Sequence, residues 1–293
     1  MPPPPPMAAE QIEPDAQTYA EFGLPSGPLV FHLVKGADGS HLIPVAELTS
    51  DSLRSIRRPA NVSREAYEGR FRETVLPIGA QFEVFRRGAR VGTFVAQSYG
   101  PVTSCGVPTA IGNTTVVAAA ADATDFLAYR QGLSPSVRGD YLPPQMTGPI
   151  RTYASIVAER LILGAGLPRP RSWAGAQRDL QPIEVHPGGH PEMATTYLVG
   201  DNLAVGPADP NGYSVFYIAD YEAQRGYTPI YTEVRDYRRA EKAAPRLIDY
   251  LAWDATEGPE ILVQVFGSTD SWFEVISQRD GEWRKIYEGG PCV

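Results

Sequence analysis

Lysine is scarce in this sequence, and long apolar runs are missing. Only Lys35, Lys242 and Lys285 are lysines among 26 basic residues, and 34 acidic residues give a net charge of −8. Proteins that bind DNA or RNA need basic surfaces that contact phosphates, so we expect no nucleic-acid partner. The best apolar stretch, residues 116–128, is interrupted by Asp122 and Asp125. It falls short of the ~18 apolar residues of a membrane span, so we expect no span.

Familiar catalytic motifs are also missing. The sequence has no G-x-S-x-G, H-E-x-x-H or G-x-x-x-x-G-K-[ST] pattern. The pair Gly164 and Gly166 lacks the third glycine and the preceding strand of a dinucleotide fingerprint. We therefore expect no catalytic residue and no cofactor. One alternative is an acid–base pair in a cleft, but paired acids are common on solvated strands. Its candidates are Asp220, Glu222, Glu233 and Asp236.

Cysteine occurs twice, at Cys105 and Cys292, each beside glycine or proline and without a C-x-x-C motif. We predict a disulfide between them, which would remove the thiolate that a nucleophilic Cys105 needs. A disulfide favours an extracytoplasmic location, periplasmic or secreted. The start, Met1 followed by five prolines, has no basic and apolar regions of a signal peptide. A cytoplasmic location is therefore the alternative.

Turn-forming and aromatic residues are abundant. The chain has 28 glycines and 28 prolines, and its aromatic residues are concentrated after Tyr197. Aromatic rings pack well on pleated sheets. We predict an α+β, mainly β fold of antiparallel sheets and hairpins with a few short helices, in two domains. The predicted parts are a Pro-rich arm (1–26) without core periodicity, a β-rich domain (27–131), a Pro/Gly-rich linker (132–149) and an α+β domain (150–293).

Local patterns predict several elements. Arg87-Gly88 and Asp280-Gly281 each lie between apolar, strand-like runs and predict hairpin turns. Helices are predicted over 63–75, with Ser63 as the cap, and over 151–163. The second helix should bury a stripe of Tyr153, Ile156, Val157 and Leu161. Later strands are expected near 194–198, 214–218, 230–234, 261–266, 272–276 and 283–287.

The most metal-like string is His186-Pro-Gly-Gly-His190. Proline and glycine break any helix, so the two imidazoles cannot share a helical face. We interpret the string as a surface turn and predict no metal site.

Residues 180–199 align with residues 248–267 at an offset of 68, and both segments pass through a loop into Pro-Glu and a strand. This spacing suggests one supersecondary unit used twice. The loops resemble the D-x-D-G-D-G-x-P-E loop of calcium-binding FG-GAP repeats, in which alternating oxygen ligands hold the ion. The resemblance implies ligand positions at Glu184, His186, Gly188 and Glu192, and at Ala252, Asp254, Thr256 and Glu260.

Most of the carboxylates of that pattern are missing, so we expect no tight calcium binding. Residues 150–293 also resemble uncharacterised exported bacterial proteins with degenerate loops of this kind. That resemblance implies no activity.

Three functions fit these observations. The first is a non-catalytic structural or interaction protein, an accessory subunit bound to protein partners on the periplasmic face of a membrane complex such as a respiratory or photosynthetic one. The second is a module that binds a sugar, a peptide or an ion, and the third is an enzyme of unrecognised type.

Overall fold

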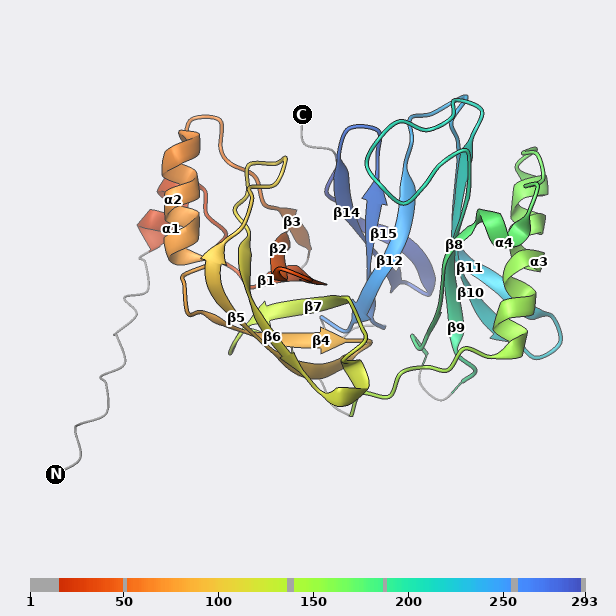
Figure 1. The fold of residues 1–293 in the computed structure, drawn as a ribbon, viewed down its shortest axis with the longest axis horizontal. Coiled ribbons are helices and arrows are strands. Elements are labelled where there is room, and N and C mark those ends of the chain that lie inside the picture. The colour runs from red at the N-terminus through yellow and green to blue at the C-terminus, as the bar shows by residue number, and fades with distance from the viewer. Residues whose placement is uncertain (1–15, 50–51, 136–139, 187–188, 254–257, 291–293) are drawn as a thin grey trace.

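The computed structural model describes residues 16–49, 52–135, 140–186, 189–253 and 258–290, which form a barrel followed by two packed sheets (Figure 1). Every strand pairing among these residues is antiparallel, as predicted, and strands far outnumber helices. Among the described residues, no helix combines the length and the apolar character that crossing a bilayer requires.

Six strands close the barrel in the order β1-β7-β4-β5-β6-β2, because β2 also pairs with β1, and the short strand β3 extends the sheet beside β2. Their bounds are β1 (Leu29–Gly36), β2 (Gly39–Leu48), β3 (Leu53–Ser55), β4 (Gln81–Arg86), β5 (Ala89–Tyr99), β6 (Ala110–Val116) and β7 (Asp125–Arg130), with a 3-10 turn at Ala118–Ala120. The predicted turn is confirmed: Arg87 and Gly88 have φ of 48° and 77° and join β4 to β5. Both central residues of this turn type need positive φ.

Aromatic side chains fill the barrel. Phe31 contacts Phe82 edge to face at 5.2 Å between ring centroids, and Phe82 contacts Phe94 at 5.9 Å. Helix α2 (Arg64–Thr74) covers one end and buries Tyr67 and Phe71 there, one turn apart. Ser63 caps this helix by accepting a hydrogen bond from the Ala66 amide, as predicted. The interior is therefore a packed core.

The Pro-rich arm predicted over residues 1–26 lacks core periodicity, yet part of it packs on the barrel core. Helix α1 (Ala16–Phe22) lies beside α2, and Tyr19 and Phe22 pack on the barrel core (Figure 1). Leu24 is 4% exposed. Too few apolar residues occur here to form a recognisable period. Residues 1–15 lie outside the described part of the chain.

Two four-stranded antiparallel sheets follow. The second sheet of the protein has the order β11-β10-β9-β8, and the third is the meander β12-β13-β14-β15. Their bounds are β8 (Gln177–Ile183), β9 (Glu192–Val199), β10 (Tyr213–Glu222), β11 (Gly226–Asp236), β12 (Ala244–Leu251), β13 (Glu260–Phe266), β14 (Ser271–Arg279) and β15 (Glu282–Glu288). The turn at Asp280 and Gly281 is confirmed, with φ of 56° and 80°.

The layers run from the barrel through the third sheet and the second sheet to helix α3 (Gly148–Gly164) (Figure 1). Apolar residues of the two sheets, such as Phe216 and Val263, share one core. The opposite face of the third sheet packs on the barrel through residues such as Leu262. Helix α3, with the short helix α4 (Trp173–Ala176), covers the second sheet.

Helix α3 buries a stripe shifted from the predicted one. Val157 is buried and Tyr153 and Leu161 pack on the same core, as predicted, whereas Ile156 is 41% exposed. The fully buried positions are centred on a neighbouring face of the helix. They are Ile150, Ala154, Val157, Ala158 and Ile162. Small alanines let the helix approach the sheet closely, so burial does not follow side-chain hydrophobicity alone.

Candidate functional site

A groove runs along β3, where α1, the barrel end and the third sheet meet. Its first part is a cavity of about 630 Å³ lined by Tyr19, Leu24 and Ile56, among others. The second part, about 310 Å³, lies between the barrel and the third sheet, and the third, about 320 Å³, lies beside residues 103–106. Arg57 lines all three cavities, so they adjoin one another. We call this region the arginine groove, after Arg54, Arg57, Arg58 and Arg64.

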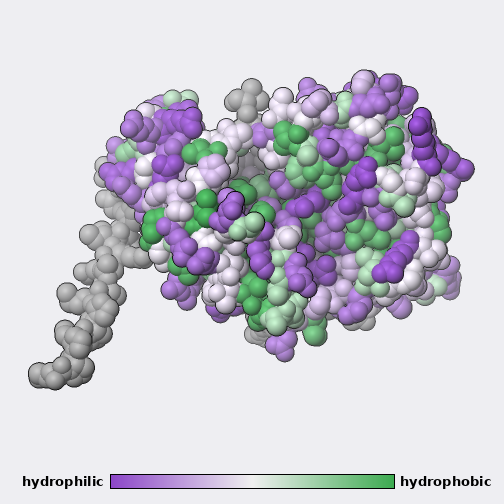
Figure 2. Space-filling view, viewed as in Figure 1, coloured by the Kyte–Doolittle hydropathy of each residue, from purple (hydrophilic) through white to green (hydrophobic). Residues whose placement is uncertain are grey.

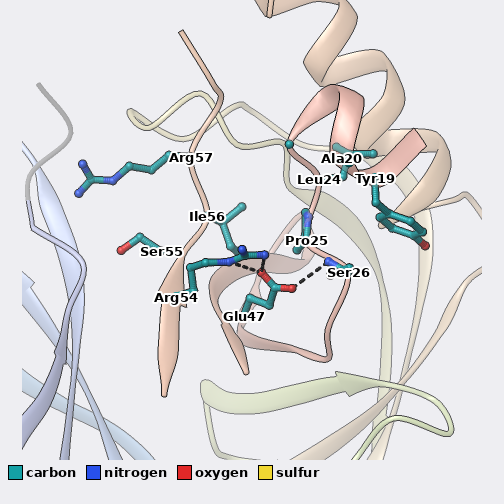
Figure 3. A pocket seen from close by; sticks show the side chains of 11 residues that line it. Tyr19, Ala20, Leu24, Pro25, Ser26, Glu47, Arg54, Ser55, Ile56 and Arg57 are labelled. Carbon is teal, nitrogen blue, oxygen red and sulfur yellow. Dashed lines mark hydrogen bonds and ion pairs between the residues drawn. The ribbon is translucent and has the colours of Figure 1, made fainter. Parts of the chain in front are cut away.

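Glu47 anchors the floor of the first cavity (Figure 3). Its Oε1 accepts hydrogen bonds from the Ser26 and Gly27 amides at 2.8 and 2.6 Å, and its Oε2 accepts from Arg54 Nε at 2.8 Å. The side chain is buried and ties the segment after α1 to β2. Arg57 extends from β3 in the other direction, towards the third sheet (Figure 3).

The charges of the groove are unevenly neutralised. Arg54 pairs with Glu47, and Arg64 pairs with Glu68 at 2.6 Å. Arg57 donates to the Gly289 carbonyl at 2.8 Å, and Arg58 donates to main-chain carbonyls. Within the described residues, neither Arg57 nor Arg58 has a carboxylate within 4.0 Å.

The described residues of the groove offer positive charge and hydrogen-bond donors. No histidine occurs among the described residues that line the groove. Its carboxylates, Glu47 and Asp270, already accept hydrogen bonds, Asp270 from Ser104 Oγ at 2.7 Å. A guanidinium forms forked hydrogen bonds with carboxylates, so Arg57 and Arg58 can hold an acidic ligand.

The predicted disulfide falls partly outside the described residues, because Cys292 is not among them. Cys105 lines the second and third cavities of the groove and packs against the barrel core. Gly289 and Gly290 line the second cavity with Cys105. The pairing of Cys105 with Cys292 stays a prediction.

The aligned Pro-Glu pairs occupy equivalent places in the two sheets. Glu192 begins β9 and Glu260 begins β13, and both are buried. Each accepts a hydrogen bond from the amide seven residues earlier: Val185 donates to Glu192 Oε2 at 3.0 Å, and Trp253 donates to Glu260 Oε2 at 2.8 Å. The glutamate of this repeat therefore fixes its loop. Gly188, Asp254 and Thr256 lie outside the described residues.

The His186–His190 string separates its two imidazoles. His186 Nδ1 lies 2.7 Å from Glu192 Oε1, while the His190 ring contacts the Tyr221 ring at 4.4 Å between centroids. Burial raises the pKa of Glu192, although its hydrogen bonds with the Val185 amide and His186 lower it. His186, Glu192 and Asp220 each place one ligand atom within 4.8 Å of the others. The sequence predicted no metal site, and Asp220 was considered only for acid–base work.

The four acids considered for catalysis do not converge. Asp220 lies beside Glu192, whereas Glu222 pairs with Arg225 at 3.4 Å. Glu233 lies near Lys285 at 3.8 Å. Asp236 pairs with Arg238 at 2.7 Å. Each has a different neighbour, so no acid–base pair forms among them.

Comparison with protein-family models, curated proteins and solved structures finds no match to this sequence.

Sequence reasoning missed the groove. Its signal was the run Arg54-Ser55-Ile56-Arg57-Arg58, which places three arginines within five residues of an acidic chain.

Proposed function

We propose that the protein is a non-catalytic interaction protein that binds an acidic, extended segment of a protein partner in the arginine groove. We further propose that the partner belongs to a membrane complex and is bound on its periplasmic face. The single observation that carries the proposal is that Arg57 and Arg58 line adjoining cavities and have no carboxylate within 4.0 Å among the described residues.

The dimensions of the groove support an extended occupant. Its three cavities adjoin one another around Arg57 and the loop at 103–106, so a ligand contacting all of them must be extended. Apolar side chains such as Tyr19, Leu24 and Ile56 offer pockets between the charges. Such pockets can select side chains, and the guanidiniums can pair with carboxylates.

Charge supports an acidic occupant. The whole chain carries −8, yet two guanidiniums gather here without carboxylates among the described residues. A local patch opposite in sign to the rest of the protein orients an acidic partner during encounter. The view in Figure 2 shows a mixed surface of hydrophilic and scattered hydrophobic residues outside this region.

The test is affinity capture from native membranes with Arg57→Glu/Arg58→Glu and with the matched control Arg151→Glu/Arg171→Glu, whose arginines are exposed and far from the groove. We expect the wild type and the control to capture the same membrane subunit, and the groove variant to lose it. Capture should weaken as salt rises, since exposed charges are screened. Equal capture by both variants would contradict the proposal.

A second candidate function, an ion-binding module, is favoured by His186, Glu192 and Asp220.

A further inference from the structure

The two sheets offer an internal comparison, because the same buried glutamate occurs in each. Glu260 of the third sheet has a permanent positive partner: Arg279 Nη2 lies 3.0 Å from its Oε1. A buried carboxylate is costly unless it is paired and hydrogen-bonded, and Arg279 meets that need.

The equivalent position of the second sheet has no arginine. Met193 and Ile261 are equivalent in the repeat, and they pair with Ala219 and Ile276 on the next strand of their sheets. The residue three positions after the partner is Glu222 in the second sheet and Arg279 in the third, so these two positions correspond. Glu192 has no lysine or arginine within 4.0 Å among the described residues. Instead a second carboxylate, Asp220, lies near it. A buried and a half-buried carboxylate therefore lie together without a lysine or arginine beside them among the described residues, which favours a positive charge there.

We infer that the second sheet binds a divalent transition-metal ion through one imidazole nitrogen of His186 and one carboxylate oxygen each of Glu192 and Asp220. The ion takes the place that Arg279 fills in the third sheet. This site is independent of the arginine groove.

The geometry approaches that of a bound ion. At tetrahedral angles, zinc bonds of ~2.0–2.2 Å place two ligand atoms about 3.3–3.6 Å apart. The three ligand atoms here lie within 4.8 Å of one another, so side-chain shifts of about 1 Å complete the site. His186 is 43% exposed and its side chain can make that shift, whereas Glu192 is buried and held by two amides. Outer hydrogen bonds fix the orientation of metal ligands. The two amides therefore hold Glu192 in one orientation towards the ion.

The donor set selects the kind of ion. One imidazole and two carboxylates suit zinc and its neighbours, whereas calcium takes six to eight oxygen ligands. Asp220 comes from β10, outside the loop that resembles a calcium site. With three protein ligands, a tetrahedral ion keeps a fourth position for water.

The experiment titrates tag-free, chelator-treated protein with Zn²⁺ by calorimetry and with Co²⁺ by absorption spectroscopy. We expect one ion per chain, and a loss of affinity of about 10-fold or more in Asp220→Asn and His186→Gln. Glu222→Gln is the matched control on the same strand, and His190→Gln is the control within the loop. Both should bind as the wild type does. Circular dichroism confirms that each variant is folded, and Asp220→Asn removes a ligand without touching the loop.

Two results would overturn the inference. One is a wild type that binds no Zn²⁺. The other is a Zn²⁺ affinity that persists in Asp220→Asn but disappears in His190→Gln, because the two histidines would then form the site.

Discussion

Asp125 joins the barrel to the sheets through a buried polar junction, and replacing it with asparagine should strongly destabilise the protein. Its Oδ1 accepts from His32 Nε2 at 2.9 Å and from Arg246 Nη2 at 2.6 Å, and its Oδ2 accepts from Thr124 Oγ1 at 2.8 Å. Arg246 belongs to β12, so this contact crosses between the barrel and the third sheet. The side chain of Asp125 is 13% exposed.

The magnitude follows from what asparagine leaves unpaired. The variant removes the negative charge beside Arg246 and offers one acceptor where two were used. Breaking a buried charge pair and its hydrogen bonds costs about 2–4 kcal/mol. Urea unfolding followed by tryptophan fluorescence measures the loss. Asp122→Asn, at an exposed position three residues away, is the control and should change stability by less than about 0.5 kcal/mol.

The same junction makes stability depend on pH. Burial lowers the pKa of His32, despite the opposing effect of Asp125, so the native imidazole stays neutral while the unfolded one takes up a proton. Stability is therefore lost as pH falls below about 6.5. Burial raises the pKa of Asp125, but His32, Arg246 and Thr124 outweigh it and hold that pKa well below its usual range.

The contribution of Asp125 to the free energy of unfolding is present above about pH 4 and is lost as pH falls further. Asp125→Asn should still lose stability below about pH 6.5, because His32 is unchanged, but should lack the further loss below about pH 4. An unfolding free energy within about 0.5 kcal/mol of the wild type at pH 7, or an unchanged pH profile below 4, would refute this reasoning.

Three further predictions concern the barrel, the cysteines and the loops. Gly112→Ala should destabilise the barrel by about 1–3 kcal/mol or more, because its Cβ would lie 2.0 Å from the Val95 carbonyl oxygen. Gly69→Ala in α2, with no atom within 4 Å of the new Cβ, should instead stabilise by about 0.5–1 kcal/mol; thermal unfolding showing the same sign for both would contradict the packing. Non-reducing peptide mapping should find Cys105 linked to Cys292, with reduction costing up to about 5 kcal/mol in the entropic model, and two thiols in the native protein would disprove the pairing. Calcium should not bind either loop with micromolar affinity, since too few carboxylates are present; calorimetry that shows such binding, lost in Glu184→Ala or Glu192→Ala, would prove this wrong.

The sequence predicted features that depend on neighbouring residues. The turns at Arg87-Gly88 and Asp280-Gly281 need residues that accept positive φ, and the cap at Ser63 acts within three residues. The duplicated unit was visible because Pro-Glu recurs at the same offset as the strands β9 and β13.

Strands β8 and β12 were missing from the predicted list of strands. Strand β8 contains Pro182 and alternates charged and apolar residues only briefly. It forms an edge of its sheet, where proline is tolerated. Strand β12 is buried on both faces, between the barrel and the second sheet, and so lacks alternation. Tertiary packing determines that both segments form strands, and local sequence patterns do not contain that information.

The candidate sites depend on contacts between distant segments. Arg57 and Gly289 are far apart in the chain, yet a hydrogen bond joins them. Asp220 approaches Glu192 only because β10 pairs with β9 in a particular register. Such register is set by the whole sheet, so the residues could be named from the sequence but not brought together.

The most direct test of the proposed function places a photo-crosslinking residue at Ser55, which is partly exposed and lines the first two cavities near Arg57. The protein is irradiated with native membranes, and the crosslinked peptide is sequenced by mass spectrometry. The same residue at exposed Ile156 on α3 is the control. We predict that position 55 captures an acidic segment of one membrane subunit, and that Arg57→Glu/Arg58→Glu abolishes this crosslink. Crosslinking at position 55 that is no stronger than at position 156, or that persists in the charge-reversed protein, would contradict the account.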